Sequence, residues 1–504
     1  MNQYQYEFNI LGNYINGKFQ IPEDPQGEWN MSCPGDLEDQ FGAIQYSYKS
    51  VDDAICAAKE AFPAWKKKSN EERAGYLNKY QSILEKRKKE IAGAISRETG
   101  KPLWESLSEV TTMINKIKIT LEDSMDLIKE VAVTGIGKDT QGFCRHKPLG
   151  VLAVIGPFNF PGHLPNGHII PALASGNTVV FKPASKTPFT GQILAECLDE
   201  AEIPRGVFNL IQGEQEVGRR LCVHQDVQGI LFTGSYEVGL RIKQDTLQQH
   251  WKLLALEMGG KNSAIVWDDC HLESAIYETL TGAFLTAGQR CTSTSRIILH
   301  KKIFNQFLEG FHKLAKTLKV GHAFDEPFMG PLIDGTSVDR YLKFQGTAVR
   351  EGFELVMRGK TLDLEKKGHY VTPSICSNNN LSLDQAKKSV YYQTELFSPN
   401  VLMIATDDID EAVAFANLNQ YGLANSVFTQ NKDTFNQCFL DLESGIINWN
   451  KTTVGASSKL PFGGLKKSGN HFPTALYSTR YCTYPVASIE AKQPTRTEFP
   501  GMGN

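Results

Sequence analysis

Residues 151–183, VLAVIGPFNFPGHLPNGHIIPALASGNTVVFKP, determine the fold class. They begin with the apolar run VLAVIG and end with a second run, TVVFKP, and the segment HIIPALASG between them suits a buried helix. Short continuous apolar runs are typical of strands that are covered on both faces of a parallel sheet. Two such strands joined through a helix form a βαβ unit, which predicts an α/β fold.

The same alternation continues along the chain. VFNLIQG (207–213) and GILFTG (229–234) predict two more strands, preceded by an amphipathic helix over 189–202. A second α/β region follows between about 260 and 450. Its clearest strands are SAIVW, SRIILH, NVLMIAT and NSVFTQ, and its helices are expected at 270–288, 303–318, 337–351, 409–418 and 433–443. We therefore expect two doubly wound, Rossmann-like domains with parallel sheets, in which ligands bind at the carboxyl ends of the strands.

The flanking segments have other patterns. Residues 1–45 predict short strands and turns, and apolar residues spaced three or four apart predict helices over 51–130, with an interruption at Gly100 and Pro102. Residues 133–148 contain three glycines and predict a hairpin. We expect the short β-like pieces after residue 470 to pair with it.

Composition excludes several classes of function. The 504 residues suffice for two or three domains, and 53 basic and 56 acidic residues give a net charge of −3 without a basic block. Neither a nucleic acid nor a membrane surface is therefore indicated as a partner. The polar N-terminal segment lacks a signal-peptide pattern. The ten cysteines include no CxxC pair, which predicts neither a metal site nor a disulfide framework and favours a reducing, cytoplasmic compartment.

One cysteine has unusual surroundings. Cys291 lies in TGAFLTAGQRCTSTSR (281–296), where small neighbours leave room around its sulfur. Such a thiol becomes a nucleophile when its pKa is lowered or a base stands nearby, although most cysteines only fill a core. Four upstream motifs distinguish it from the other nine cysteines: GPFNFPG (156–162), FKPAS (181–185), FTGSYEVG (232–239) and LALEMGGKN (254–262).

Two of these motifs have the pattern of an anion-binding site. In FTGSYEVG a strand ends, Gly234 permits a tight turn and Ser235 is placed to cap a helix, whose free N–H groups and dipole favour a phosphate. A plain capped turn is the alternative. Lys182 leaves its strand at the carboxyl end, where it would hold a ribose hydroxyl or a phosphate, or would simply be solvated.

The other two motifs carry groups suited to acyl chemistry. Glu257 ends an apolar strand, and desolvation there would raise its pKa into the range of a general base working near neutral pH. The alternative is a surface glutamate. Asn159 lies between aromatic and proline residues, where its amide would donate to an oxyanion or cap the turn.

The order and spacing of these motifs resemble the aldehyde dehydrogenase superfamily from about residue 14 to 487, and LEMGGKN and GQRCT are highly specific to it. The resemblance implies that Cys291 attacks the aldehyde carbonyl to form a thiohemiacetal. Asn159 and the Cys291 backbone N–H would form the oxyanion hole. After hydride transfer to NAD or NADP, Glu257 would activate the water that hydrolyses the thioester.

The resemblance also implies a cofactor site. Lys182 would contact the adenosine ribose, and Glu395 in TELFSP, with Phe397 beside it, would hold the nicotinamide ribose. The pyrophosphate contact would comprise Gly234, Ser235, Tyr236, Glu237, Val238 and Gly239.

Two departures from the family pattern concern the cofactor. Ser185 and Lys186 replace the acid that usually follows KPA in NAD-selective members, so we expect NADP to be accepted. Ser398 replaces a common glycine, which would set the Glu395 loop slightly differently.

The three-part build of the family implies a domain division. Residues 1–132 and 149–258 would form the dinucleotide-binding domain, and 259–466 the catalytic domain. Residues 133–148 and 467–504 would form a small β oligomerisation arm and tail, in a homodimer or a dimer of dimers.

Four longer stretches resemble the branch of the superfamily that acts on N-succinylglutamate 5-semialdehyde, in the succinyl route of arginine catabolism: 98–117, 158–173, 447–464 and 468–475. A dehydrogenase acting on another semialdehyde, such as succinate semialdehyde, is the closer alternative. A coenzyme-A-acylating enzyme would have little need of Glu257. A non-catalytic protein that kept the fold is the alternative from a different class.

The substrate-binding residues are predicted from their chemistry. Cationic and hydroxyl side chains beside the nucleophile and in the loop before Phe462 would bind substrate carboxylates, or would be solvated rim residues. The predicted set is Arg290, Lys451, Ser457, Ser458 and Phe462. Lys261 departs from this branch, for which an asparagine is expected.

Overall fold

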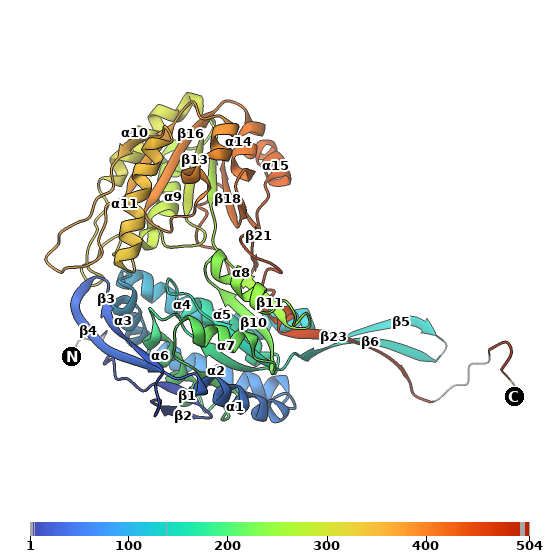
Figure 1. Cartoon of the computed structure of the whole chain (residues 1–504). Helices are drawn as coiled ribbons and strands as arrows, with labels where there is room; N and C mark the ends of the chain where they lie inside the picture. Colours follow the sequence, from blue (N-terminus) through green and yellow to red (C-terminus); the bar gives the residue numbers. More distant parts are fainter. Residues whose placement is uncertain (1–3, 5, 138, 494–498, 503–504) are drawn as a thin grey trace.

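The computed structural model describes residues 4, 6–137, 139–493 and 499–502. Figure 1 shows two α/β bodies, one above the other, and a long arm of strands that projects sideways from the lower body. Each body is built on a seven-stranded sheet that is mostly parallel. The predicted α/β fold class, with two doubly wound sheets and a small β arm, is confirmed.

The first sheet contains the strands predicted from the opening stretch. Its order is β11-β10-β7-β8-β9-β1-β2, with β1 and β2 antiparallel at one edge. The bounds are β1 (Asn13–Ile15), β2 (Lys18–Gln20), β7 (Val151–Ile155), β8 (Thr178–Lys182), β9 (Phe208–Leu210), β10 (Val227–Thr233) and β11 (Leu253–Glu257). The chain runs outward from β7 in one direction and from β10 in the other. The loops after these two strands therefore diverge and leave a crevice at their carboxyl ends.

Helices cover both faces of this sheet. They are α1 (Lys49–Trp65), α2 (Asn70–Lys86), α3 (Lys88–Thr99), α4 (Leu103–Ile119), α5 (His163–Ala174), α6 (Pro188–Glu200), α7 (Gln215–Val223) and α8 (Tyr236–Asp245). The helical region predicted over 51–130 is thus divided, because Ser69 and Glu72 form a capping box at the start of α2 and Gly100, at φ +74°, ends α3. A π-helical turn, η1 (Thr120–Ser124), and a 3-10 turn, η2 (Met125–Ile128), extend α4.

The second sheet has the order β14-β15-β16-β13-β12-β18-β19, with β14 antiparallel. Its strands are β12 (Asn262–Val266), β13 (Thr294–His300), β14 (Glu354–Met357), β15 (Ser374–Asn378), β16 (Asn400–Thr406), β18 (Ala424–Phe428) and β19 (Ile446–Trp449). The helices around it are α9 (Leu272–Phe284), η4 (Lys301–Ile303), α10 (Phe304–Ala315), α11 (Gly335–Arg350), α12 (Leu383–Lys388), α13 (Val390–Gln393), α14 (Ile409–Asn417) and α15 (Lys432–Asp441).

The helix predicted over 270–288 ends early. α9 stops at Phe284, and in the short turn η3 (Leu285–Gly288) Thr286 and Ala287 have φ values of 55° and 54°. Positive φ is rare for residues with a side chain, so it interrupts the helix here. The chain leaves this turn directly into the segment that carries Cys291.

The arm is a three-stranded antiparallel sheet of β5 (Val131–Gly137), β6 (Thr140–Pro148) and β23 (Thr483–Ala491). β23 pairs with β6 from Thr483–Pro148 to Ala491–Thr140, which confirms the predicted pairing of the tail with the hairpin. Residue 138 of the predicted hairpin, and 494–498 and 503–504 of the predicted tail, lie outside the described residues. Within the described part of the chain, the structure contains no helix with the length and apolar character needed to cross a membrane.

The remaining strands are short or lie near the N-terminus: β3 (Gly27–Cys33), β4 (Asp36–Tyr46), β17 (Tyr421–Gly422), β20 (Pro461–Phe462), β21 (Leu465–Lys466) and β22 (Thr474–Ala475). A short helix, α16 (Ser478–Tyr481), precedes the arm strand β23.

The two sheets contribute opposite ends of their strands to the cleft between them. Asn159 follows β7 and Glu257 ends β11, so the first sheet presents carboxyl ends, as predicted. Cys291 precedes β13 and Glu395 precedes β16, so the second sheet presents amino ends. The expectation that the motifs fall at carboxyl ends therefore holds for the first body alone.

Candidate active site

A buried asparagine at the start of β12 holds the Cys291 segment in place. Asn262 donates from Nδ2 to the carbonyl oxygens of Cys291 and Ser293, at 2.8 and 2.9 Å, and accepts from the Ala424 backbone N–H at 3.0 Å. Gly260 passes so close that a Cβ there would lie 2.3 Å from the Cys291 carbonyl oxygen. These contacts hold the thiol-bearing turn in a single position.

The Cys291 thiol is protonated at neutral pH in this state. Burial raises its pKa to about 12, the negative charges of Glu257 and Glu395 add to this effect, and Arg290 opposes it. A thiol in this state needs a proton acceptor before it can act as a nucleophile.

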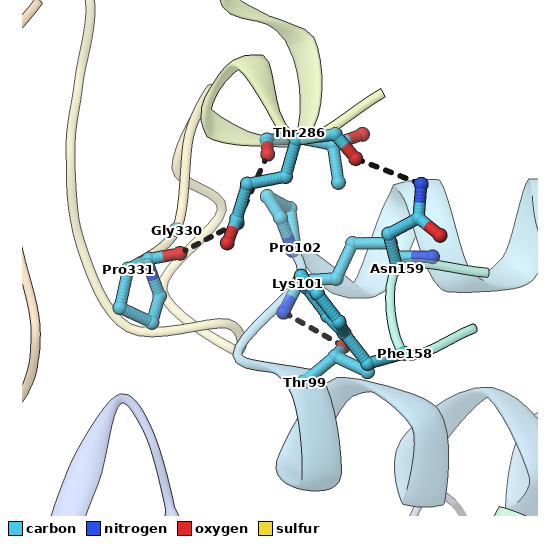
Figure 2. Close-up of a pocket in the computed structure, with 9 residues that line it drawn as sticks. Thr99, Lys101, Pro102, Phe158, Asn159, Thr286, Gly330 and Pro331 are labelled. Carbon is cyan, nitrogen blue, oxygen red and sulfur yellow. Dashed lines mark hydrogen bonds between the residues drawn. The ribbon is translucent and has the colours of Figure 1, made fainter. Parts of the chain in front are cut away.

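Asn159 lines the same cavities as the nucleophile and uses one of its two N–H groups for a hydrogen bond within the described part of the chain. The residue is 6% exposed and donates from Nδ2 to the Gln289 carbonyl oxygen at 2.9 Å. A primary amide has two donors, so the second remains for another acceptor. Figure 2 shows Asn159 at the wall of a cavity of about 10 Å³, with Lys101 and Pro331 on other sides. So small a space holds at most one water molecule, so Asn159 is firmly packed.

Glu257 is a buried acidic residue that forms no ion pair with any residue the structure describes. Its side chain is 2% exposed, and Oε1 has no hydrogen-bond partner among the described residues. Burial raises the pKa of Glu257 well above its ordinary value. A Cβ at Gly463 would lie 3.0 Å from Oε1, which shows how closely the opposite loop covers this acid. A carboxylate with a raised pKa is a stronger base, which suits a group that accepts a proton in catalysis.

A cleft of about 980 Å³ runs between the two bodies and reaches Cys291, Asn159 and Glu257. Most of the residues predicted to bind the cofactor line it: Lys182, Ser185, Gly234, Ser235, Glu237, Val238, Glu395 and Phe397. Ser235 caps α8 by accepting from the Val238 N–H, as predicted. Tyr236 and Gly239 instead line a neighbouring cavity, where the Lys467 ammonium lies 4.5 Å from the centre of the Tyr236 ring.

Lys182 and Lys186 also line this cleft. The ammonium of Lys182 donates to the carbonyl oxygens of Pro183 and Gly213 at 2.7 and 2.9 Å, and burial lowers its pKa to about 8. Lys186 forms an ion pair of 3.2 Å with Asp334, the residue that caps α11 in the other body. The positive charge expected from the sequence at this position is therefore partly neutralised.

Glu395 enters the cleft from the second body. Its Oε1 accepts from the Gly260 backbone N–H at 2.9 Å, and a Cβ at Gly259 would lie 1.9 Å from Oε2. Burial raises the pKa of Glu395 to about 7, and the Gly260 N–H opposes this shift. Phe397 has φ 53° and packs edge-on against Phe158 at 5.9 Å.

Ser398 and Lys261, two residues that depart from the expected family pattern, are both buried. Ser398 is 6% exposed, and its Oγ has no hydrogen-bond partner among the described residues. Lys261 is 3% exposed, and its pKa falls to about 7 because of burial, with Arg296 adding to the effect.

A second cavity of about 240 Å³ meets the cleft at Cys291. Four of the predicted substrate-binding residues line it: Arg290, Ser457, Ser458 and Phe462. Lys451 does not; its ammonium lies 3.3 Å from Glu278 and its side chain is 74% exposed. Arg290 is already paired with Glu105 at 2.5 Å and donates to Thr286 at 2.8 Å.

Sequence reasoning missed several residues of this region. Asn262 was part of the quoted LALEMGGKN motif, but its role in holding Cys291 depends on a contact across β12 and β13. Glu105, Lys116 and His163 line the second cavity from α4 and α5. The regular helical pattern around the first two gave no signal that they face a cavity.

Comparison with known proteins agrees with this geometry. The chain matches the aldehyde dehydrogenase family over residues 23–485. It is 40% identical over 447 residues to N-succinylglutamate 5-semialdehyde dehydrogenase from Chromobacterium violaceum, covering 88% of this chain and 90% of that one. It is 39% identical over 491 residues to the protein of the same name from Yersinia pseudotuberculosis, covering 95% of each.

Among solved structures, an NAD-dependent aldehyde dehydrogenase from Sinorhizobium meliloti is similar with a TM-score of 0.91 and 26% identity, covering 98% of this chain and 97% of that one. The match to the family spans most of the chain, and the relatives are aligned over nearly their whole length. The chain belongs to the aldehyde dehydrogenase family.

Proposed function

We propose that this NAD(P)-dependent aldehyde dehydrogenase oxidises N-succinylglutamate 5-semialdehyde to N-succinylglutamate, a step of arginine catabolism by the succinyl route. The observation that carries the proposal is the identity of 39–40%, over most of the chain, to relatives of that name. The meeting of a large cleft and a separate cavity at one cysteine supports it. Oxidation of succinate semialdehyde is the alternative within the same chemistry.

The cleft residues suit a dinucleotide. The N-terminus of α8 lines the cleft, and the positive end of the helix dipole there favours a pyrophosphate. Gly259 leaves no room for a side chain against the Glu395 carboxylate, so that acid stays aimed at the space where a ribose would lie. Lys182 would hold the adenosine ribose, and the bound nicotinamide would supply the hydride acceptor.

The addition step uses Cys291 and Asn159. The Cys291 thiol passes its proton to solvent in the cleft. The sulfur adds to the aldehyde carbon, and a C–S bond forms as the carbonyl π bond opens onto oxygen. The free N–H of Asn159 and the Cys291 backbone N–H donate to this oxyanion. When the oxyanion collapses, the aldehyde hydrogen leaves as hydride with two electrons, and Cys291 carries a thioester.

The hydrolysis step uses Glu257. Its carboxylate removes a proton from a water molecule, and the resulting hydroxide adds to the thioester carbon. The C–S bond then breaks to release the carboxylic acid, and Glu257 returns its proton to the Cys291 sulfur. The absence of any hydrogen bond to Oε1 within the described residues leaves that oxygen available to the water.

Both cofactors are expected to serve, and the Lys186–Asp334 pair sets their ratio. Lys186 attracts a 2′-phosphate, and Asp334 weakens that attraction by pairing with the ammonium at 3.2 Å. Ser185 adds a small polar side chain without a charge at the same place.

The domain division and assembly are part of the proposal. Residues 1–132 and 149–258 form the dinucleotide-binding domain, 259–466 the catalytic domain, and 133–148 with 467–504 the oligomerisation arm and tail. The arm projects from the body (Figure 1) and exposes apolar side chains such as Val133 and Ile489, which supports a homodimer or a dimer of dimers. The cysteine pattern of the sequence supports a cytoplasmic location.

The test is the formation of reduced nicotinamide with purified enzyme. N-succinylglutamate 5-semialdehyde and succinate semialdehyde are compared side by side, each with NAD and with NADP. We expect the higher kcat/KM for the succinylated substrate. A higher value for succinate semialdehyde would refute the proposed substrate and leave the chemistry intact.

A further inference from the structure

The second cavity contains a glycine that packing does not explain. Gly167 lies inside α5, is buried and lines the cavity, yet a Cβ there would meet no described atom within 4 Å. By contrast, a Cβ at Gly93 in α3 would lie 1.8 Å from the Tyr4 carbonyl oxygen. A glycine inside a helix costs about 1 kcal/mol relative to alanine. Since no close contact requires Gly167, the space beside it is the feature to explain.

The same cavity contains a lysine without an acidic partner. Its charged lining residues, all of which the structure describes, are Glu105, Glu109, Lys116 and Arg290. Glu105 pairs with Arg290, and Glu109 pairs with Lys101. Lys116 is 1% exposed and donates only to two neutral acceptors, the Ala475 carbonyl oxygen at 2.6 Å and Ser478 Oγ at 3.1 Å. An ammonium has three donors, so one is left for a ligand.

A histidine of the cavity also has an unpartnered polar atom. His163, at the start of α5, has a buried Nδ1 atom without a hydrogen-bond partner in the described part of the chain. Burial lowers the pKa of His163 to about 4 and that of Lys116 to about 7, because desolvation disfavours both cations. A bound anion would reverse both shifts by supplying the missing negative charge.

We propose that Lys116, His163 and Gly167 form a subsite for a carboxylate that the substrate carries at the end remote from its aldehyde. Lys116 donates its third N–H to this carboxylate, His163 donates from Nδ1, and the open space at Gly167 admits the chain that carries the group. The inference rests on the proposed function and deepens it, because it assigns the succinyl carboxylate to named residues. It gives Lys116 the role expected for Lys451, which lies outside the cavity.

The first test removes the charge of the subsite. Lys116→Met keeps the length of the side chain, and Lys118→Met is the matched control, two positions along α4 on its exposed face. Substrates are N-succinylglutamate 5-semialdehyde and its N-acetyl analogue, which lacks only the remote carboxymethyl group. Loss of a charged hydrogen bond predicts a rise in KM of about 10- to 100-fold for the succinyl compound in Lys116→Met. The acetyl compound should change by less than about threefold, and Lys118→Met should leave both unchanged.

The second test fills the space and does not endanger folding. Gly167→Ala introduces a better helix former, so its thermal midpoint should not fall. Gly167→Val should raise KM for the succinyl compound more than for its N-acetyl analogue, which lacks the group that would enter this space. His163→Phe should likewise raise KM selectively for the succinyl compound.

The outcomes separate the two proposals. A wild-type enzyme that prefers the succinyl compound, with equal KM changes for the succinyl and acetyl compounds in Lys116→Met, would overturn the subsite and leave the proposed function standing. The same holds if the Gly167 variants discriminate against no substrate. A wild-type enzyme with no preference for the succinyl compound would overturn the proposed function and the subsite together.

Discussion

Replacing Asn262 by alanine tests how the Cys291 turn is held. The change removes three hydrogen bonds and leaves two buried carbonyl groups and one N–H without their partner. At about 1 to 1.5 kcal/mol for each group, the variant should lose about 3 to 4.5 kcal/mol of folding free energy. For a body of this size, that loss corresponds to a fall of roughly 10 °C in the thermal midpoint.

The effect on catalysis should be larger than the effect on stability. The turn that carries the nucleophile loses the side chain that fixes two of its carbonyl groups, and a displacement of about 1 Å at a reacting atom costs on the order of 100-fold in rate. We therefore expect kcat to fall by about 100-fold, with slower alkylation of Cys291 by iodoacetamide.

A matched control separates the two effects. Asn209, in β9 of the first sheet, is fully buried and also makes three such bonds, to Gly206, Val179 and Asn16. Asn209→Ala should lower the thermal midpoint by a similar amount and leave kcat and thiol reactivity near the wild-type values. If Asn262→Ala melts at lower temperature but keeps wild-type turnover and alkylation rates, Asn262 does not position the nucleophile.

Three further predictions concern the cleft. Glu257→Gln should slow turnover by about 10²- to 10⁴-fold but keep a burst of one reduced nicotinamide per Cys291, and an absent burst would contradict the role of Glu257 in hydrolysis alone. Because the variant lacks a negative charge near Cys291, the pKa of the thiol should fall and the pH profile of its alkylation by iodoacetamide should move to lower pH. Glu395, with a pKa raised to about 7, loses its charge as pH falls through 7, so KM for the dinucleotide should rise below pH 7 in the wild type and stay flat in Glu395→Gln. Asp334→Asn keeps the helix cap but frees Lys186, so kcat/KM for NADP should rise by up to about fivefold, whereas Lys186→Ala should lower it; equal NADP kinetics in all three proteins would exclude the pair from cofactor selection.

The fold could be predicted from the sequence because its signals are local. VLAVIG and TVVFKP are buried on both faces, so burial leaves an apolar run that the sequence displays directly, and both strands appear where expected. The break at Gly100 and Pro102 was predicted and separates α3 from α4. The breaks between α1, α2 and α3 were not, since apolar periodicity continues through them. Ser69 and Glu72, which form the capping box, are common surface residues in any helix.

The site was only partly predictable, because burial of a polar residue depends on distant segments. Lys116 lies two positions before the exposed Lys118 near the end of α4, where a lysine indicates a solvated face. Its burial depends on distant segments such as Ala475 and Ser478, which accept its hydrogen bonds. The opposite holds for Lys451. Its sequence position suggests a substrate contact, but its ammonium pairs with Glu278 of α9 outside the second cavity. Local patterns identify reactive groups well and identify their partners poorly.

The cleft and the second cavity, which meet at Cys291, are lined by largely separate sets of residues. They share only Asn159, Leu164, Cys291, Phe462 and Thr474 among the residues that line them. Mutations that alter α4 or the 455–458 loop can therefore change which aldehyde binds without disturbing the residues that hold the nicotinamide cofactor or the catalytic residues. An ancestral enzyme with this layout could have changed its substrate specificity through the residues of the second cavity while its catalytic chemistry stayed constant.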